Sequence, residues 1–284
     1  MSLQIIVDSS TDLRDGLKER LTVIPMSIRF GQTEYVDGVT IDRTRFYQML
    51  VESDVLPTTS QVSPADFGRV FGQVAAAGDT AVVITLSGKL SGTCQSAMLA
   101  AQDYPGVIRV VDSESAAVGA GILAEEAVLL RDSGLGCDAL ADSLDRRKKD
   151  IRVIAMLDTL EYLKKGGRIS ATAAFAGGLL SIKPVVAIAD GEVKVLGKAR
   201  GSRQGNNLLV QEIEKAGGVD FSRPVLLGWT GLSDGLLRKY IQDSWSLWGH
   251  SADELHTTQI SSVIGVHTGP GTIAAAFFSS SAAR

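Results

Sequence analysis

The chain has 284 residues, enough to bury a sizeable core, and its length predicts two domains. Apolar residues make up 45% of it, charged residues 21%, and the formal net charge is −4. These values exclude a disordered, collagen-like or coiled-coil chain. The net charge is slightly acidic, and the sequence has no cluster of basic residues typical of a nucleic-acid-binding protein, so we expect neither DNA nor RNA as a partner.

The sequence contains no recognisable targeting segment and no motif that is typical of a metal or cofactor site. No apolar run is long enough to span a membrane, and no signal peptide is evident, so a cytoplasmic location is expected. Cys94 and Cys137 stand in unrelated contexts, and the three histidines form no ligand motif. Neither a Walker A loop nor a dinucleotide-binding glycine pattern is present. We therefore expect no metal and no cofactor.

Strands and helices alternate along the first half. Asp42 is a candidate helix cap, and Ser63 followed by Pro64 is a typical helix start. The expected strands are Ile5–Asp8, Leu21–Ile28, Thr80–Thr85 and Val107–Asp112, and the expected helices cover 43–52, 63–77, 93–101 and about 116–131. Continuous apolar strands are typical of a sheet covered on both faces. The expectation is an α/β domain over residues 1–150, with a mainly parallel sheet and flanking helices.

The second half has a different pattern. Asp190–Gly191 between two apolar runs predicts a tight hairpin. Further strands are expected at 152–157, 225–229, 256–261 and 272–278, with helices at 158–165 and 233–243. These elements indicate an α+β domain over residues 151–284 with a mixed or antiparallel sheet.

Hydroxyl-rich loops follow the strands of the first half, where open α/β sheets bind ligands. The loop Ser87–Thr93 combines Ser91 with Gly88 and Gly92 at a helix start. Such a loop can receive a phosphate or a carboxylate through hydroxyls and backbone N–H groups. The alternative is that its hydroxyls only cap their own helix.

Two further segments are candidate sites. His267 lies in Ile264–Thr272, which we interpret as a glycine-rich loop whose bends direct the imidazole, either toward a carboxylate or in a structural role. The cations of Lys164–Arg168 are either a helix C-terminus or a contact for an anion or partner.

One enzyme motif competes with a binding role. Gly231–Gly235 has the pattern G-x-S-x-G between a strand and a helix, as a nucleophile elbow requires. Ser233, Asp253 and His267 even occur in the triad order. However, few residues follow Ser233, and Ser233 is also a reasonable helix cap. A serine acyl hydrolase is therefore the alternative hypothesis.

Several motifs together resemble the DegV family, the bacterial fatty-acid-binding proteins that serve as subunits of fatty acid kinase. The resemblance covers nearly the whole chain. The motifs are IIVDSSTDL from Ile5, TTSQ from Thr58, SGKLSGTCQSA from Ser87, VVDSESAAVGAG from Val110, DTLEYLKKGGRIS from Asp158, IKPVVAIADGEV from Ile182 and IGVHTGPG from Ile264.

The resemblance implies a long-chain fatty acid in an apolar tunnel between or beneath the two domains. It implies that Thr59, Ser91 and His267 hold the carboxylate, with a backbone N–H from Gly92. Arg168 and Arg200 are weaker candidates, either for contacts with the carboxylate or for contacts with the kinase. The resemblance also implies a non-catalytic carrier, without catalytic residues, that presents the acid to a separate ATP-dependent kinase subunit and contacts membranes transiently.

Overall fold

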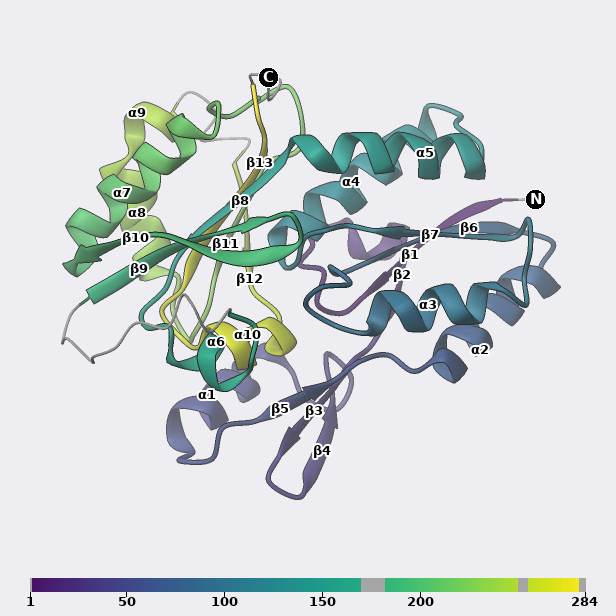
Figure 1. Cartoon of the computed structure of the whole chain (residues 1–284), viewed down its shortest axis with the longest axis horizontal. Coiled ribbons are helices and arrows are strands. Elements are labelled where there is room, and N and C mark those ends of the chain that lie inside the picture. The colour runs from purple at the N-terminus through teal and green to yellow at the C-terminus, as the bar shows by residue number, and fades with distance from the viewer. Residues whose placement is uncertain (1, 170–181, 250–254, 281–284) are drawn as a thin grey trace.

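The apolar strands of the first half form a parallel sheet. This computed structural model describes residues 2–169, 182–249 and 255–280 (Figure 1). The strand order is β2-β1-β6-β7, and all three neighbouring pairs are parallel. The strands are β1 (Leu3–Asp8), β2 (Thr22–Ile24), β6 (Thr80–Thr85) and β7 (Ile108–Asp112). The expectation of a parallel sheet in an α/β first half is confirmed.

Helices cover both faces of this sheet, which is why its strands are apolar throughout. Figure 1 shows α2 and α3 on one side and α4 and α5 on the other. Ile5 and Val82 pack with α4 and α5, whereas Ile6 and Val83 pack with α2 and α3. The helices are α2 (Pro64–Ala76), α3 (Thr93–Ala101), α4 (Val118–Asp132) and α5 (Cys137–Arg147). The predicted cap of α2 is present, because Ser63 Oγ accepts from the Asp66 backbone N–H at 3.1 Å.

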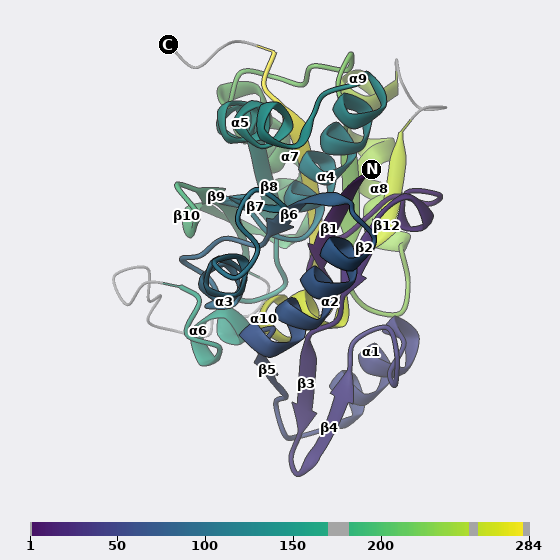
Figure 2. The same ribbon diagram turned by 90° about the vertical axis from the view of Figure 1, so that its right-hand side faces the viewer.

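A small antiparallel sheet projects from the parallel one (Figure 2). Its order is β4-β3-β5, with β3 (Ser27–Phe30), β4 (Thr33–Val36) and β5 (Thr58–Ser60), and α1 (Arg43–Glu52) packs beside it. The single strand predicted over Leu21–Ile28 is wrong, because β2 ends at Ile24 and β3 begins at Ser27. Pro25 separates them, since proline has no N–H for either ladder.

The second half forms a mixed sheet of order β10-β9-β8-β13-β11-β12. Only the pair β11–β12 is parallel among those described. The strands are β8 (Ile151–Met156), β9 (Ile182–Ala189), β10 (Glu192–Arg200), β11 (Leu226–Trp229), β12 (His256–Gln259) and β13 (Ile273–Phe278). The predicted hairpin is confirmed: Asp190 and Gly191 have φ values of 53° and 77°, as a tight turn of this kind requires.

One face of the mixed sheet is covered by α7 (Gly201–Lys215), α8 (Gly235–Asp243) and α9 (Trp245–Trp248). The sequence patterns did not single out α7. The other face meets α4, because Val153 and Ala274 share a core with Val118 and Ile122. Helix α4 therefore lies between the two main sheets, and every residue from Val118 to Val128 is buried.

Candidate ligand-binding site

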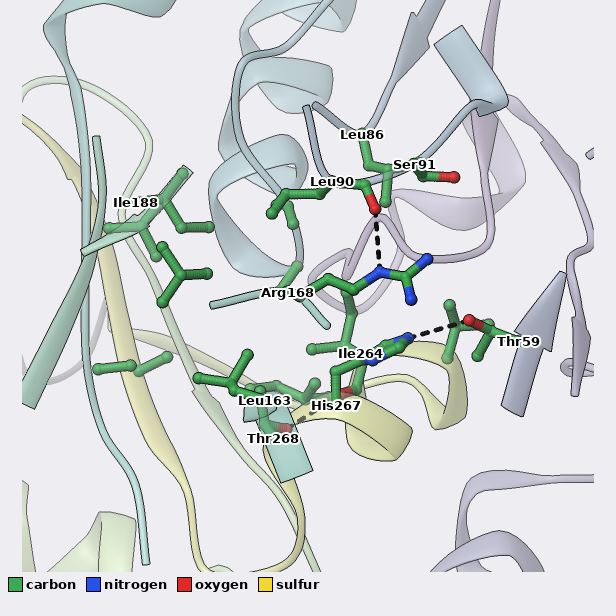
Figure 3. A pocket seen from close by; sticks show the side chains of 18 of the residues that line it. Thr59, Leu86, Leu90, Ser91, Leu163, Arg168, Ile188, Ile264, His267 and Thr268 are labelled. Atoms are coloured by element: carbon green, nitrogen blue, oxygen red, sulfur yellow. Dashed lines mark hydrogen bonds between the residues drawn. The ribbon is translucent and has the colours of Figure 1, made fainter. Parts of the chain in front are cut away.

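An apolar cavity of about 430 Å³ lies where the two main sheets approach each other (Figure 3). This volume is within the range of small-molecule sites. Its walls come from the loops after β6 and β7, from a face of the mixed sheet and from two short helices, α6 (Glu161–Lys165) and α10 (Ser262–Thr268). The apolar residues that line it are Met26, Leu86, Leu90, Ala116, Ala117, Val153, Ala155, Leu157, Leu163, Val186, Ala187, Ile188, Val193, Ile260, Val263, Ile264 and Ala274.

Five of the six sequence-predicted site residues lie in the lining of this cavity: Thr59, Ser91, Gly92, Arg168 and His267. Thr59 Oγ1 and His267 Nε2 share a hydrogen bond of 2.9 Å, although 208 positions separate them in the chain. Thr59 reaches the cavity because β5 pairs with β3, where Thr59 stands opposite the buried Ile28. Figure 3 shows the Arg168 side chain between the Leu90 loop and His267. Thr59, Arg168 and His267 thus lie together in a cavity whose lining is mostly apolar. Thr268 and Thr272 also line it, but their hydroxyls donate to the backbone carbonyls of Ile264 and Thr268.

The glycine-rich loop expected at Ile264–Thr272 is partly wrong, because Ser262–Thr268 is the helix α10. Gly265 lies inside this helix for a packing reason: a Cβ there would come within 2.7 Å of both Phe46 and Tyr47 on α1. The bend follows only at Gly269 and Gly271, whose φ values are 69° and 78°. His267 is therefore oriented by a helix rather than by a loop.

His267 is mostly buried and uncharged. Burial, and to a smaller degree the Arg168 guanidinium, lower the pKa of the imidazole to about 4, so it is neutral at pH 7. Its Nδ1 has no hydrogen-bond partner among the described residues. Gly166 packs against this atom, and a Cβ at that glycine would lie 2.3 Å from it. A glycine is thus required where the end of α6 meets the imidazole.

Ser91 and Gly92 precede α3, and Figure 3 shows Ser91 on the far side of the Arg168 guanidinium from Thr59 and His267. Ser91 Oγ lies 3.0 Å from Thr93 Oγ1 and accepts from the Thr93 backbone N–H at 3.2 Å, so it binds the start of its own helix although Gly92 is the N-cap residue. Gln61 covers Gly92, where a Cβ would lie 2.1 Å from Gln61 Oε1. Gln61 also lines the cavity, and sequence reasoning did not select it. The signal for it was its place at the end of the TTSQ motif.

The two candidate arginines have different positions. Arg168 Nε donates to the Leu90 carbonyl at 3.2 Å and Nη1 to the Gly166 carbonyl at 2.5 Å, so its cation joins two loops of the cavity wall. Arg200 is exposed at the end of β10, and it does not line the cavity. Its backbone N–H donates to Gln204 Oε1 at 3.1 Å. The structure therefore brings Arg168, and not Arg200, to the other candidates.

Ser233 lies outside the cavity. Its side chain is exposed, and its Oγ accepts from the Gly235 backbone N–H at 3.1 Å at the start of α8. Asp253, the acid expected to follow it, is outside the described residues. His267 forms its hydrogen bond with Thr59 instead. No contact in the described part of the chain favours Ser233 as a nucleophile.

Residues 2–280 match the sequence profile of the DegV family, which is described as a family of uncharacterised proteins. The chain belongs to the DegV family. A DegV domain-containing protein of Deinococcus radiodurans is 30% identical over 283 residues, covering 97% of this chain and 98% of that protein. The family assignment inferred from the motifs is therefore confirmed.

Solved DegV structures have the same fold. A DegV-family protein of Thermus thermophilus, described by its fatty acid binding, has a TM-score of 0.86 at 32% identity and covers 98% of this chain and 100% of its own. A stearic-acid-binding protein of Eubacterium ventriosum has a TM-score of 0.84 at 28% identity, with 98% of both chains covered. Both neighbours are described as fatty-acid-binding proteins.

Two classes of feature are missing from the described part of this DegV chain. No helix there is both long and apolar enough to cross a bilayer. Within residues 2–169, 182–249 and 255–280, no group of three or more histidine, cysteine or acidic side chains is arranged to hold a metal ion.

Proposed function

We propose that this protein binds one long-chain fatty acid, with its tail in the apolar cavity and its carboxylate at Thr59, Ser91, Gly92, His267 and Arg168. The observation that carries the proposal is the segregation of the cavity into apolar walls and one polar cluster. An amphipathic ligand with a single acidic head matches this division. The fatty-acid-binding relatives of the same fold support the choice of ligand.

The energetics favour such a ligand. Burying a tail of about 16 carbons at about 0.8 kcal/mol per CH₂ gives more than ~10 kcal/mol of transfer free energy, before the entropy of confinement. A carboxylate that entered the same cavity without donors would cost several kcal/mol. The hydroxyls of Thr59 and Ser91 and the cation of Arg168 offset that cost. The neutral imidazole supplies either a donor or an acceptor, depending on its tautomer.

We further propose that the protein is a carrier without catalytic activity of its own, which presents the acid to a separate ATP-dependent kinase. The resemblance to fatty acid kinase subunits supports this role, and so does the position of Ser233, which is exposed, outside the cavity and 3.1 Å from the Gly235 backbone N–H that donates to it. ATP-dependent formation of an acyl phosphate, seen only when a candidate kinase is mixed with the loaded protein, is the result expected of this role.

The test of lipid binding is extraction of the purified protein with organic solvent, followed by mass spectrometry. We expect a free fatty acid near one equivalent, and rebinding of hexadecanoic acid after delipidation. Thr59→Val and Ser91→Ala should each weaken rebinding about tenfold, because each removes a hydrogen bond to a charged group.

Ser233→Ala is the matched control, since it removes an exposed hydroxyl outside the cavity. It should rebind the acid like the parent protein. Absence of bound lipid together with failure to rebind would exclude the carrier. Esterase turnover that disappears in Ser233→Ala would instead support the hydrolase.

A further inference from the structure

Helix α10, which carries His267, begins without a cap from its own side chains. The backbone N–H of its N-cap residue, Ser261, donates to Asp12 Oδ1 at 2.7 Å, across 249 positions of sequence. Asp12 belongs to the loop that follows β1, and its side chain is completely buried. The N-terminal loop of the parallel sheet therefore fixes the start of a helix that belongs to the second half of the chain.

Arg43 also binds Asp12 and the residues that precede α10. This first residue of α1 donates from Nη2 to Asp12 Oδ1 at 3.1 Å. Its Nη1 donates to the Gln259 carbonyl and lies 3.3 Å from Thr258 Oγ1. Arg43 thus binds both the carboxylate and the strand end that leads into α10.

Tyr47, one turn further along α1, completes the arrangement. Its hydroxyl donates to the Ile260 carbonyl at 3.0 Å, just before α10 begins. The two helices are in such close contact that only glycine fits at position 265. Figure 2 shows α1 beside α10, at the base of the small sheet.

We propose that Asp12, Arg43 and Tyr47, together called the α10 clamp, are positioning residues for the head-group site. By fixing residues 258–261, the clamp sets the place of α10 and so of His267, one turn and a half further along. None of the three forms part of the polar cluster that we propose for the carboxylate. The inference rests on the proposed fatty-acid function and deepens it by naming what aligns the imidazole.

The physical reason is geometric. The hydrogen bond between Thr59 and His267 joins two elements that share no secondary structure, so its length depends on where α10 lies. Hydrogen bonds weaken steeply with distance and misalignment, and a site held loosely by about 1 Å loses most of its effect. The tail makes apolar contacts over the whole cavity and tolerates such a shift better.

This difference between head and tail gives the test. Affinities of hexadecanoic acid and of hexadecanol are measured on the full-length delipidated protein by displacement of anilinonaphthalene sulfonate. In the parent protein we expect the acid to bind more tightly than the alcohol. Asp12→Ala removes both bonds to Oδ1 and should reduce this acid preference about tenfold. The affinity for the alcohol should change less than twofold.

Asp12→Asn is the conservative variant, because its amide oxygen can accept from Ser261 and Arg43. Burial raises the pKa of Asp12 to about 7, although the nearby Arg43 cation acts to lower it. Because burial favours the uncharged form, an uncharged side chain is suited to this position. Asp12→Asn should therefore keep most of the acid preference. A loss as large as that of Asp12→Ala would contradict the role assigned to Oδ1.

Glu125→Gln is the matched control. Glu125, on α4, is another largely buried carboxylate, and it forms an ion pair with Arg14 at 2.5 Å. It should leave the acid preference unchanged. If Asp12→Ala does not fold, Tyr47→Phe tests the clamp in its place. Because this variant loses one hydrogen bond, we expect the acid preference to fall about threefold. An unchanged acid preference in the folded clamp variants would overturn the clamp. A parent protein that binds neither ligand would overturn the proposed function instead.

Discussion

His267 shows how the fold changes the chemistry of a single residue. In water an imidazole is partly protonated near neutral pH, but burial beside Arg168 lowers the pKa of His267 to about 4. The ring therefore enters the site as a neutral group. The sequence alone does not predict the lowered pKa, because it depends on burial and on Arg168, which lies 99 positions away along the chain.

The lowered pKa predicts a pH dependence of stability. The unfolded histidine takes up a proton near pH 6.5 and the folded one only near 4, so its contribution is complete above pH 6.5 and is lost as the pH falls toward 4. Between pH 7.5 and 5 the delipidated parent protein should lose about 2 kcal/mol more unfolding free energy than His267→Gln. Urea unfolding of both proteins at several pH values measures this, and parallel stability curves would contradict it.

At the scale of elements, helices and strands with strong local signals were predictable from sequence. The caps at Asp42 and Ser63 and the Asp190–Gly191 turn act within a few residues, and the structure confirms each of them. Helix α10 was misread because Gly265 suggests a loop, whereas its lack of a side chain serves contact with α1. Sequence patterns do not separate a glycine needed for packing from one needed for a turn.

Gly265 gives a prediction at this scale. Alanine is a better helix former than glycine by about 1 kcal/mol, so Gly→Ala at an open helical position is stabilising. At position 265 the added Cβ would lie 2.7 Å from atoms of Phe46 and Tyr47, and overpacking costs about 1–3 kcal/mol. We expect Gly265→Ala to lower the unfolding free energy.

Gly68→Ala is the matched control, because Gly68 lies inside α2 with nothing within 4 Å of an added Cβ. It should raise the unfolding free energy by about 0.5–1 kcal/mol. Urea denaturation midpoints of the two variants should therefore shift in opposite directions. A shift in the same direction would mean that α1 and α10 are not in fixed contact.

At the scale of the whole molecule, the proposed boundary near residue 150 separates two sheets that share a buried helix. Helix α4 packs on both sheets, and its Glu126 is paired with Arg147 of the first half and with Arg223 of the second. The cavity takes its walls from both halves, from Ala117 on one side to Ala274 on the other. A ligand there would contact both halves of the chain at once.

This arrangement predicts that the two halves unfold together. The delipidated protein should show one thermal transition, and hexadecanoic acid should raise its midpoint as its concentration increases. At a hundredfold excess over Kd the gain is about 2.7 kcal/mol. Differential scanning calorimetry with and without the acid measures this. Two transitions, of which the acid shifts only one, would show that the domains are independent.

The sequence by itself determined the alternation of strands and helices and the parallel sheet of the first half, which depend on hydrophobic periods, caps and turns that act over a few residues. Its motifs determined the family. The sequence left a mixed or an antiparallel sheet open for the second half, and the parallel pair β11–β12 decides for a mixed one. Tertiary structure decided which candidates meet: Thr59 and His267 form a hydrogen bond, Arg168 joins them, and Arg200 stays outside. It also decided that Asp12 supports α10. Such contacts depend on how sheets and helices pack, and the residues that make them have no common pattern along the chain.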